Sequence, residues 1–93
     1  MNSSYTRGRA REYRSMDLLE TAGYSPLRMA GSHGVWDVVG ISASGIVLVQ
    51  VKLGCRPTLA EMEEMVTFPC PPNGTKLLHL YQVGKHLPTV EEV

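Results

Sequence analysis

The stretch from residue 37 to residue 52, DVVGISASGIVLVQVK, decides the fold of this chain. Its second half, from Ile46 to Lys52, is almost continuously aliphatic, which is typical of a central strand that is buried on both faces. Residues 36–41 read as a second strand, and the Ser-Ala-Ser-Gly sequence between the two is a turn. We therefore predict a pair of neighbouring strands with a short connection.

Three polar residues, Asp37, Gln50 and Lys52, are brought together by this strand pair. Gln50 and Lys52 are two positions apart, so their side chains leave the same face of the strand. The short connection returns Asp37, near the start of the first strand, to their neighbourhood. Charged side chains seldom occupy a sheet interior unless they are paired, so the trio indicates a functional site. The alternative is an ordinary strand-end lysine and an aspartate that caps a turn.

The whole chain, residues 1–93, is predicted to form one α/β domain of the order α-β-β-β-α-β, with one sheet flanked by helices. The second helix has a capping-box pattern at Thr58 and Glu61, and prolines from Pro69 onward end it. The other expected segments are a flexible arm (1–7), a first helix (8–23), strands at 24–29, 36–41, 46–52 and 76–83, and a tail of no clear class (84–93).

Charge is unevenly distributed along the chain, although its formal sum is zero. Glu12 is the only acid among the first fifteen residues, which also contain four arginines: Arg7, Arg9, Arg11 and Arg14. A basic end of this kind binds phosphates without reading a base sequence. The alternative is a set of arginines on a solvated helix face.

Several classes of protein are disfavoured by the composition. The cysteines and histidines lack the spacing of a zinc site. The chain has no apolar run long enough for a signal peptide or a membrane span. We expect a cytoplasmic protein, in a prokaryotic cell or a virus-infected host, with no membrane association and no nucleotide cofactor.

The residue types around Asp37 suit metal-assisted hydrolysis of a phosphodiester bond. Magnesium prefers carboxylate, carbonyl and water oxygens. We expect Asp37 to be the bridging carboxylate, with the side-chain oxygen of Gln50 and the backbone carbonyl of Val51 as further ligands. Lys52 would orient the attacking water or stabilise negative charge on the phosphate. Glu12, on the inward stripe of the first helix, would add a carboxylate from the other side.

Ser32 and His33 belong to the glycine-rich turn that precedes Asp37. This position is near enough to the predicted site for both side chains to contact the scissile phosphate. The alternative is a serine that only shapes the turn and a solvated loop histidine.

A series of motifs between residues 7 and 55 carries a family resemblance. They are RGRARE at 7–12, Leu19, Gly23-Tyr24, Arg28, Gly31-Ser32, Asp37-Val38-Val39 and Gln50-Val51-Lys52. On these motifs the chain resembles the restriction-endonuclease-like PD-(D/E)xK superfamily. Within it, the chain looks most like the archaeal and phage-type Holliday junction resolvases, with the VRR-NUC nucleases as close relatives.

The resemblance implies a restriction-endonuclease-like fold with Glu12 as the helix carboxylate and Asp37 as the main metal ligand. Gln50 and Lys52 stand as the (D/E)xK pair, and Ser32 matches a loop serine near the active centre. It also implies a homodimeric, magnesium-dependent endodeoxyribonuclease that cuts four-way DNA junctions, with manganese as a substitute ion. The DNA contacts are expected from Arg7, Arg9, Arg11, Arg14, Arg28 and His33.

Two positions depart from the superfamily pattern. Trp36 stands where the motif has proline, and Gln50 stands where most resolvases have an acid. A neutral amide is a poorer ligand than a carboxylate for a hard cation, although VRR-NUC-like relatives use glutamine at this place. Two further hypotheses stay open: a VRR-NUC-like nuclease that acts on flaps, nicks or duplex, and a non-catalytic DNA-binding module of the same fold.

Overall fold

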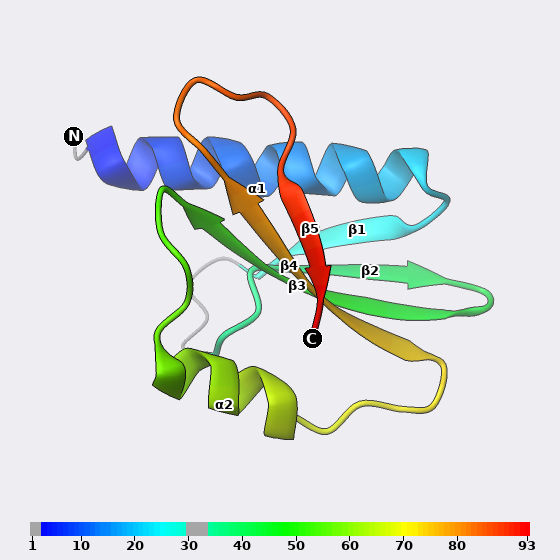
Figure 1. Ribbon diagram of the computed structural model, residues 1–93. Helices are drawn as coiled ribbons and strands as arrows, with labels where there is room; N and C mark the ends of the chain where they lie inside the picture. The colour runs from blue at the N-terminus through cyan, green and yellow to red at the C-terminus, as the bar shows by residue number, and fades with distance from the viewer. Residues whose placement is uncertain (1–2, 30–33) are drawn as a thin grey trace.

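A five-stranded mixed sheet and two helices make up the described part of this small α/β domain (Figure 1). The computed structural model describes residues 3–29 and 34–93, with side chains from residue 8 onward. The elements are α1 (Ser3–Thr21), β1 (Ser25–Arg28), β2 (Val38–Ser42), β3 (Gly45–Leu53), α2 (Leu59–Thr67), β4 (Gly74–Tyr81) and β5 (Thr89–Glu92). Neither α1 nor α2 is long and apolar enough to cross a membrane.

The strands lie in the sheet in their chain order, β1-β2-β3-β4-β5. β3 and β4 are parallel, with α2 in the connection between them, and the other neighbouring pairs are antiparallel. The aliphatic strand predicted at residues 46–52 is β3, which occupies the centre of the sheet. This prediction is confirmed, and so is the β2–β3 hairpin, in which Ser42 pairs with Gly45.

Two hydrophobic cores form on the two faces of the sheet, because successive side chains of β3 point to opposite faces. The core on the α1 side contains Leu19, Val38, Val47 and Val49. The core on the α2 side contains Trp36, Leu48 and Met65. The ring of Trp36 also meets that of Phe68 edge-to-face, with 5.7 Å between centroids. The sheet is therefore covered by one helix on each face.

The start of α2 is fixed by the predicted capping box, which the structure confirms. The hydroxyl of Thr58 accepts a hydrogen bond from the backbone N–H of Glu61, and Glu61 Oε1 accepts one from the backbone N–H of Thr58, at 3.1 and 2.9 Å. The helix ends at Thr67, and Phe68 is extended, as expected for a residue that precedes a proline.

The two ends of the chain differ from the prediction. α1 begins at Ser3, so residues 3–7, expected in a flexible arm, are helical, and Gly8 lies inside the helix rather than at its start. The tail at residues 84–93, which was given no class, contains β5. This strand pairs antiparallel with β4, from Leu80↔Thr89 to Leu77↔Glu92. β5 has only four residues and follows a proline, so its sequence alone does not predict a strand. The pairing with β4 supplies the hydrogen bonds that form it.

A polar network lies in the core on the α1 side. Ser15 is fully buried, and its hydroxyl lies 2.8 Å from Nδ1 of His79 and 2.9 Å from the hydroxyl of Tyr81. Burial lowers the pKa of His79 and raises the pKa of Tyr81, so both groups are held in their neutral forms. The network ties α1 to β4.

We expect Ser15→Ala to destabilise the protein by about 1–3 kcal/mol, because it leaves His79 and Tyr81 buried without their partner. Urea unfolding at pH 7.5 measures this effect. Ser25→Ala, at an exposed position of β1, is the matched control and should change the stability by less than about 0.5 kcal/mol. Equal stabilities of the two variants would show that the network contributes nothing.

Candidate functional site

Asp37 lies where the pairing between β2 and β3 ends. Its backbone N–H donates to the carbonyl of Val49 at 2.9 Å, and its carbonyl accepts from the N–H of Met29 at 2.8 Å. The pairing of β2 with β3 ends at Val38 and Val49. At the next hydrogen-bonding position of β3, the side chain of Asp37 acts as the acceptor in place of a backbone carbonyl. Its Oδ2 accepts a hydrogen bond from the backbone N–H of Val51 at 2.8 Å. Both the main chain and the side chain therefore fix this carboxylate.

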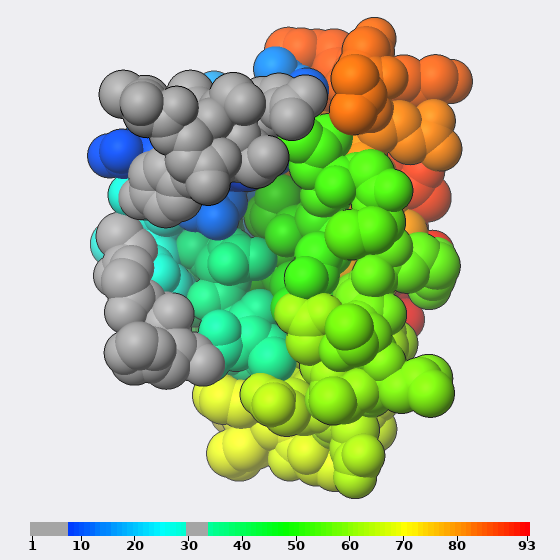
Figure 2. Space-filling view, turned by 90° about the vertical axis from the view of Figure 1, so that its left-hand side faces the viewer, coloured from blue at the N-terminus to red at the C-terminus, as the bar shows by residue number. Residues whose placement is uncertain are grey.

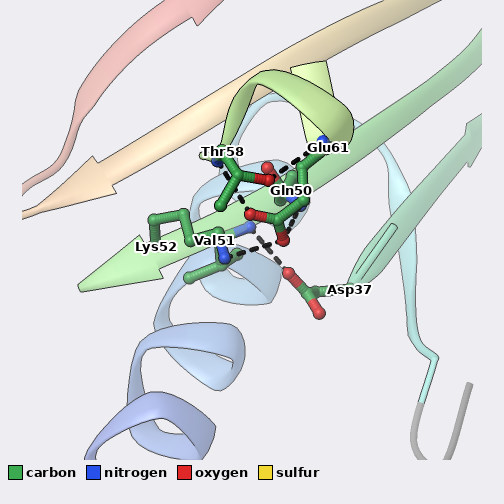
Figure 3. A network of polar contacts seen from close by, with 6 residues as sticks. All are labelled: Asp37, Gln50, Val51, Lys52, Thr58 and Glu61. Carbon is green, nitrogen blue, oxygen red and sulfur yellow. Dashed lines mark hydrogen bonds and ion pairs between the residues drawn. The ribbon is translucent and has the colours of Figure 1, made fainter. Parts of the chain in front are cut away.

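Gln50 and Lys52 leave the face of β3 that α2 covers, and both contact α2 (Figure 3). The ammonium of Lys52 donates to Glu61 Oε2 at 2.9 Å, and the amide nitrogen of Gln50 donates to the same oxygen at 3.4 Å. Gln50 is only 3% exposed, and its Oε1 has no hydrogen-bond partner among the described residues. The trio predicted from the sequence is thus brought together around the end of the β2–β3 pair.

Glu12 approaches from α1 but is held by an arginine. Its Oε1 accepts from Arg28 Nη1 at 3.0 Å, and both side chains are largely shielded from solvent, at 23% and 14% exposed. Arg28 also lies over the ring of Tyr13, 5.0 Å from its centroid. Arg28, predicted to contact DNA, therefore lies beside the predicted helix carboxylate.

The electrostatic environment of Asp37 disfavours its charged form. Burial raises the pKa of Asp37 to about 6, and the hydrogen bond from Val51 works in the opposite direction. The negative charges of Glu12 and Glu61 raise this pKa further, whereas Lys52 lowers it. Carboxylates on α1 and α2 thus both act on Asp37. A carboxyl group perturbed by burial and by specific charged neighbours is typical of a functional site.

The arginines of α1 point in several directions. Arg9 is exposed and hydrogen-bonds to Tyr13, whose pKa it lowers together with Arg28. Arg14 donates to the carbonyl of His86 at 3.2 Å and lies over the ring of Tyr81. Arg11 is half-buried. The predicted Ser32 and His33, and the side chain of Arg7, lie outside the described residues.

The residues around this site come from segments that are distant in the sequence. Figure 2 looks toward the end of the molecule at which β3 ends. The segment from residue 34 to 40 (blue-green) is seen there between α1 (blue) and the atoms of β3 and α2 (green). A separate surface groove of about 570 Å³ is lined by residues that include Arg56, Tyr81 and Glu91, and none of the predicted site residues lines it.

No protein-family model matches this chain, and a search of the curated proteins gives no match. The chemistry of the site is therefore inferred from its own geometry.

The donor set around Asp37 is compatible with a hard divalent cation. It offers the carboxylates of Asp37 and Glu12 and the buried Oε1 of Gln50, which has no hydrogen-bond partner within the described part of the chain. The backbone carbonyl of Val51, the residue whose N–H donates to Asp37, would be a further oxygen donor. Within the described part of the chain, no group of three or more His, Cys, Asp and Glu side chains could hold a metal ion by itself. An ion at this position would therefore depend on Gln50 and on the main chain.

Glu61 contacts the predicted site residues, although the sequence predicts for it only a place in the helix cap. Its spacing from Thr58 predicts the cap, but nothing in that spacing indicates a contact with Gln50 or Lys52. The connection of residues 54–58 returns the chain from β3 to the start of α2, which carries Glu61 back over the end of the strand. The short loop between the polar end of β3 and the start of α2 is the sequence feature that could have predicted this contact of Glu61.

Proposed function

We propose that this protein is a metal-dependent endodeoxyribonuclease with a restriction-endonuclease-like fold, which cuts four-way DNA junctions as a homodimer in the cytoplasm. The observation that carries the proposal is the convergence of Asp37, Gln50 and Lys52 at one end of the sheet. The order of helices and strands, with a mixed sheet between α1 and α2, agrees with the architecture that the resemblance implies.

The side chains divide the chemistry among them. Asp37 and Gln50, with the carbonyl of Val51 and with Glu12, would hold magnesium or manganese. Such an ion supplies a bound water of lowered pKa and a positive charge for the phosphate oxygens. Lys52, fixed next to these donors, stabilises negative charge that develops on the scissile phosphate or orients the attacking water. Arg28 keeps the side chain of Glu12 in one position.

A substrate panel tests the proposal against its nearest alternative. Purified protein is incubated with synthetic four-way junction, flap, nicked duplex and linear duplex, each with magnesium and with manganese. Paired nicks in the four-way junction support a junction resolvase. Cleavage of flaps, nicks or plain duplex instead would favour a VRR-NUC-like nuclease, and cleavage of no substrate with either ion would contradict both.

A second candidate function is a non-catalytic DNA-binding module of the same fold. It is favoured by the neutral Gln50 and by the ion pairs that already occupy Glu12 and Lys52. This candidate predicts that the protein binds junctions without a metal ion and cuts none of them.

Gln50→Glu separates the two candidates. For a working nuclease, the added carboxylate should lower the magnesium concentration needed for half-maximal cleavage by roughly tenfold, because ligand charge tunes the affinity for hard cations. The same change should destabilise the metal-free protein, because the hydrogen bond to Glu61 becomes a contact between two carboxylates. For a decayed site, the wild type is inactive and Gln50→Glu gains cleavage. A magnesium titration of both proteins decides between these results.

A further inference from the structure

Glu61 connects the start of α2 to two predicted site residues. One of its carboxylate oxygens, Oε1, accepts the backbone N–H of Thr58 and completes the capping box. The other, Oε2, accepts the ammonium of Lys52 at 2.9 Å and the amide nitrogen of Gln50 at 3.4 Å. A helix cap needs only the first of these interactions, so the second oxygen has a separate role.

The contact with Gln50 decides which end of the amide faces Glu61. An amide group has a donor end and an acceptor end, and the neighbouring groups determine its orientation. Because a carboxylate only accepts hydrogen bonds, Glu61 selects the NH₂ end of Gln50. The oxygen of this buried side chain is left without a partner among the described residues and stays available as a ligand.

The contact with Lys52 has a similar effect on its ammonium group. Lysine has a long and flexible side chain, which gives its charge no fixed position without a partner. The ion pair with Glu61 is partly shielded, with side chains 25% and 30% exposed, and it places this charge next to Gln50. Figure 3 shows Glu61 reaching from α2 toward both side chains of β3.

We propose that Glu61 is a positioning residue, which orients the amide of Gln50 and holds the ammonium of Lys52 for phosphodiester cleavage. This inference rests on the proposed nuclease function. It predicts that the charge of Glu61 affects the site independently of its contribution to the helix cap.

Two substitutions separate these two contributions of Glu61. Glu61→Gln suits the same position of a capping box, but it has a single side-chain oxygen and presents an NH₂ group to Lys52 or to Thr58. Thr58→Ala removes the capping hydroxyl and keeps the carboxylate. Glu63→Gln, at an exposed acid of the same helix, is the control for loss of charge.

We expect Glu61→Gln to lower kcat by roughly 10–100-fold with little change in KM, as is typical for loss of a residue that orients metal ligands. Thr58→Ala should lower the thermal midpoint and keep kcat within about threefold of the wild type when assayed well below that midpoint. Glu63→Gln should match the wild type in both measurements. A fully active Glu61→Gln variant, or an equal loss of kcat in Thr58→Ala, would overturn the proposal.

Nuclear magnetic resonance gives a second readout that does not require cleavage. The side-chain amide signals of Gln50 and the Nζ signal of Lys52 should shift in Glu61→Gln and stay close to their wild-type positions in Thr58→Ala and Glu63→Gln. Unchanged signals in Glu61→Gln would overturn the positioning role whether or not the protein is a nuclease. An inactive wild type whose signals respond as expected would contradict the nuclease function but not the contacts that Glu61 makes.

Discussion

Replacement of Asp37 by asparagine is expected to reduce DNA cleavage by roughly a thousandfold or more, and to stabilise the metal-free protein above pH 6. We expect cleavage to be lost because a neutral amide replaces the carboxylate that we propose as the central ligand of a hard cation. Stability is gained because the asparagine side chain can still accept the hydrogen bond from Val51 and carries no buried charge.

The sign of this pH effect follows from the direction of the pKa shift. The pKa of Asp37 rises from 3.8 to about 6 on folding, mainly through burial. Between these values the folded protein keeps a proton on Asp37 that the unfolded chain has lost, so the contribution of Asp37 to the stability of the wild type falls as the pH rises from about 4 to about 6. For a fully buried group the shift corresponds to about 3 kcal/mol, and since Asp37 is only half-buried we expect about 1–2 kcal/mol.

Urea unfolding at pH 4 and at pH 8 without divalent cations measures this prediction. Asp37→Asn should be more stable than the wild type at pH 8 and close to it at pH 4. Asp17→Asn, at an exposed position of α1, should follow the wild type at both values. Addition of magnesium should stabilise the wild type and leave Asp37→Asn unchanged. If Asp37→Asn is less stable than the wild type at pH 8, the charged carboxylate stabilises the fold, which would contradict this prediction.

Lys52→Met is expected to lower the rate of cleavage by roughly 10²–10⁴-fold, because it removes the positive charge that we propose acts on the scissile phosphate and keeps most of the apolar stem. The free energy of unfolding should change by less than about 1 kcal/mol, since the ion pair with Glu61 is partly exposed. Single-turnover cleavage at saturating protein measures the rate without a contribution from binding.

A binding measurement makes the Lys52 prediction specific to catalysis. Junction affinity in calcium, followed by fluorescence anisotropy, should fall by less than about tenfold in Lys52→Met. Lys85→Met, at an exposed lysine in the β4–β5 connection, should cleave like the wild type. A loss of affinity as large as the loss of rate would show that Lys52 only contacts the DNA backbone.

The sequence was most informative where the structure depends on local patterns. The aliphatic run of β3 predicts the central strand, and the short turn before it correctly places Asp37 beside Gln50 and Lys52. The capping box of α2 is also local, since it involves residues three positions apart, and it is confirmed at both hydrogen bonds. The hydrophobic pattern and the spacing of a few neighbouring residues are sufficient to predict these features.

Contacts between segments far apart in the sequence could not be predicted in this way. Arg28 pairs with Glu12 across the gap between β1 and α1, and Ser15 reaches His79 and Tyr81 of β4. β5 pairs with β4, which lies at the other end of a seven-residue connection. Such contacts depend on how the helices and strands pack against one another. The sequence of a single segment does not specify this packing. The contacts of Glu61 with Gln50 and Lys52 could not be predicted for the same reason, because the cap is local and these contacts are not.

The most direct test of the central claim compares cleavage of a synthetic four-way junction by the wild type, Asp37→Asn and Lys52→Met in magnesium, at equal junction occupancy. We predict nicked products with the wild type and a loss of at least about a hundredfold in rate with either variant. Equal rates for all three proteins, or no cleavage by the wild type with magnesium or manganese, would contradict the nuclease function.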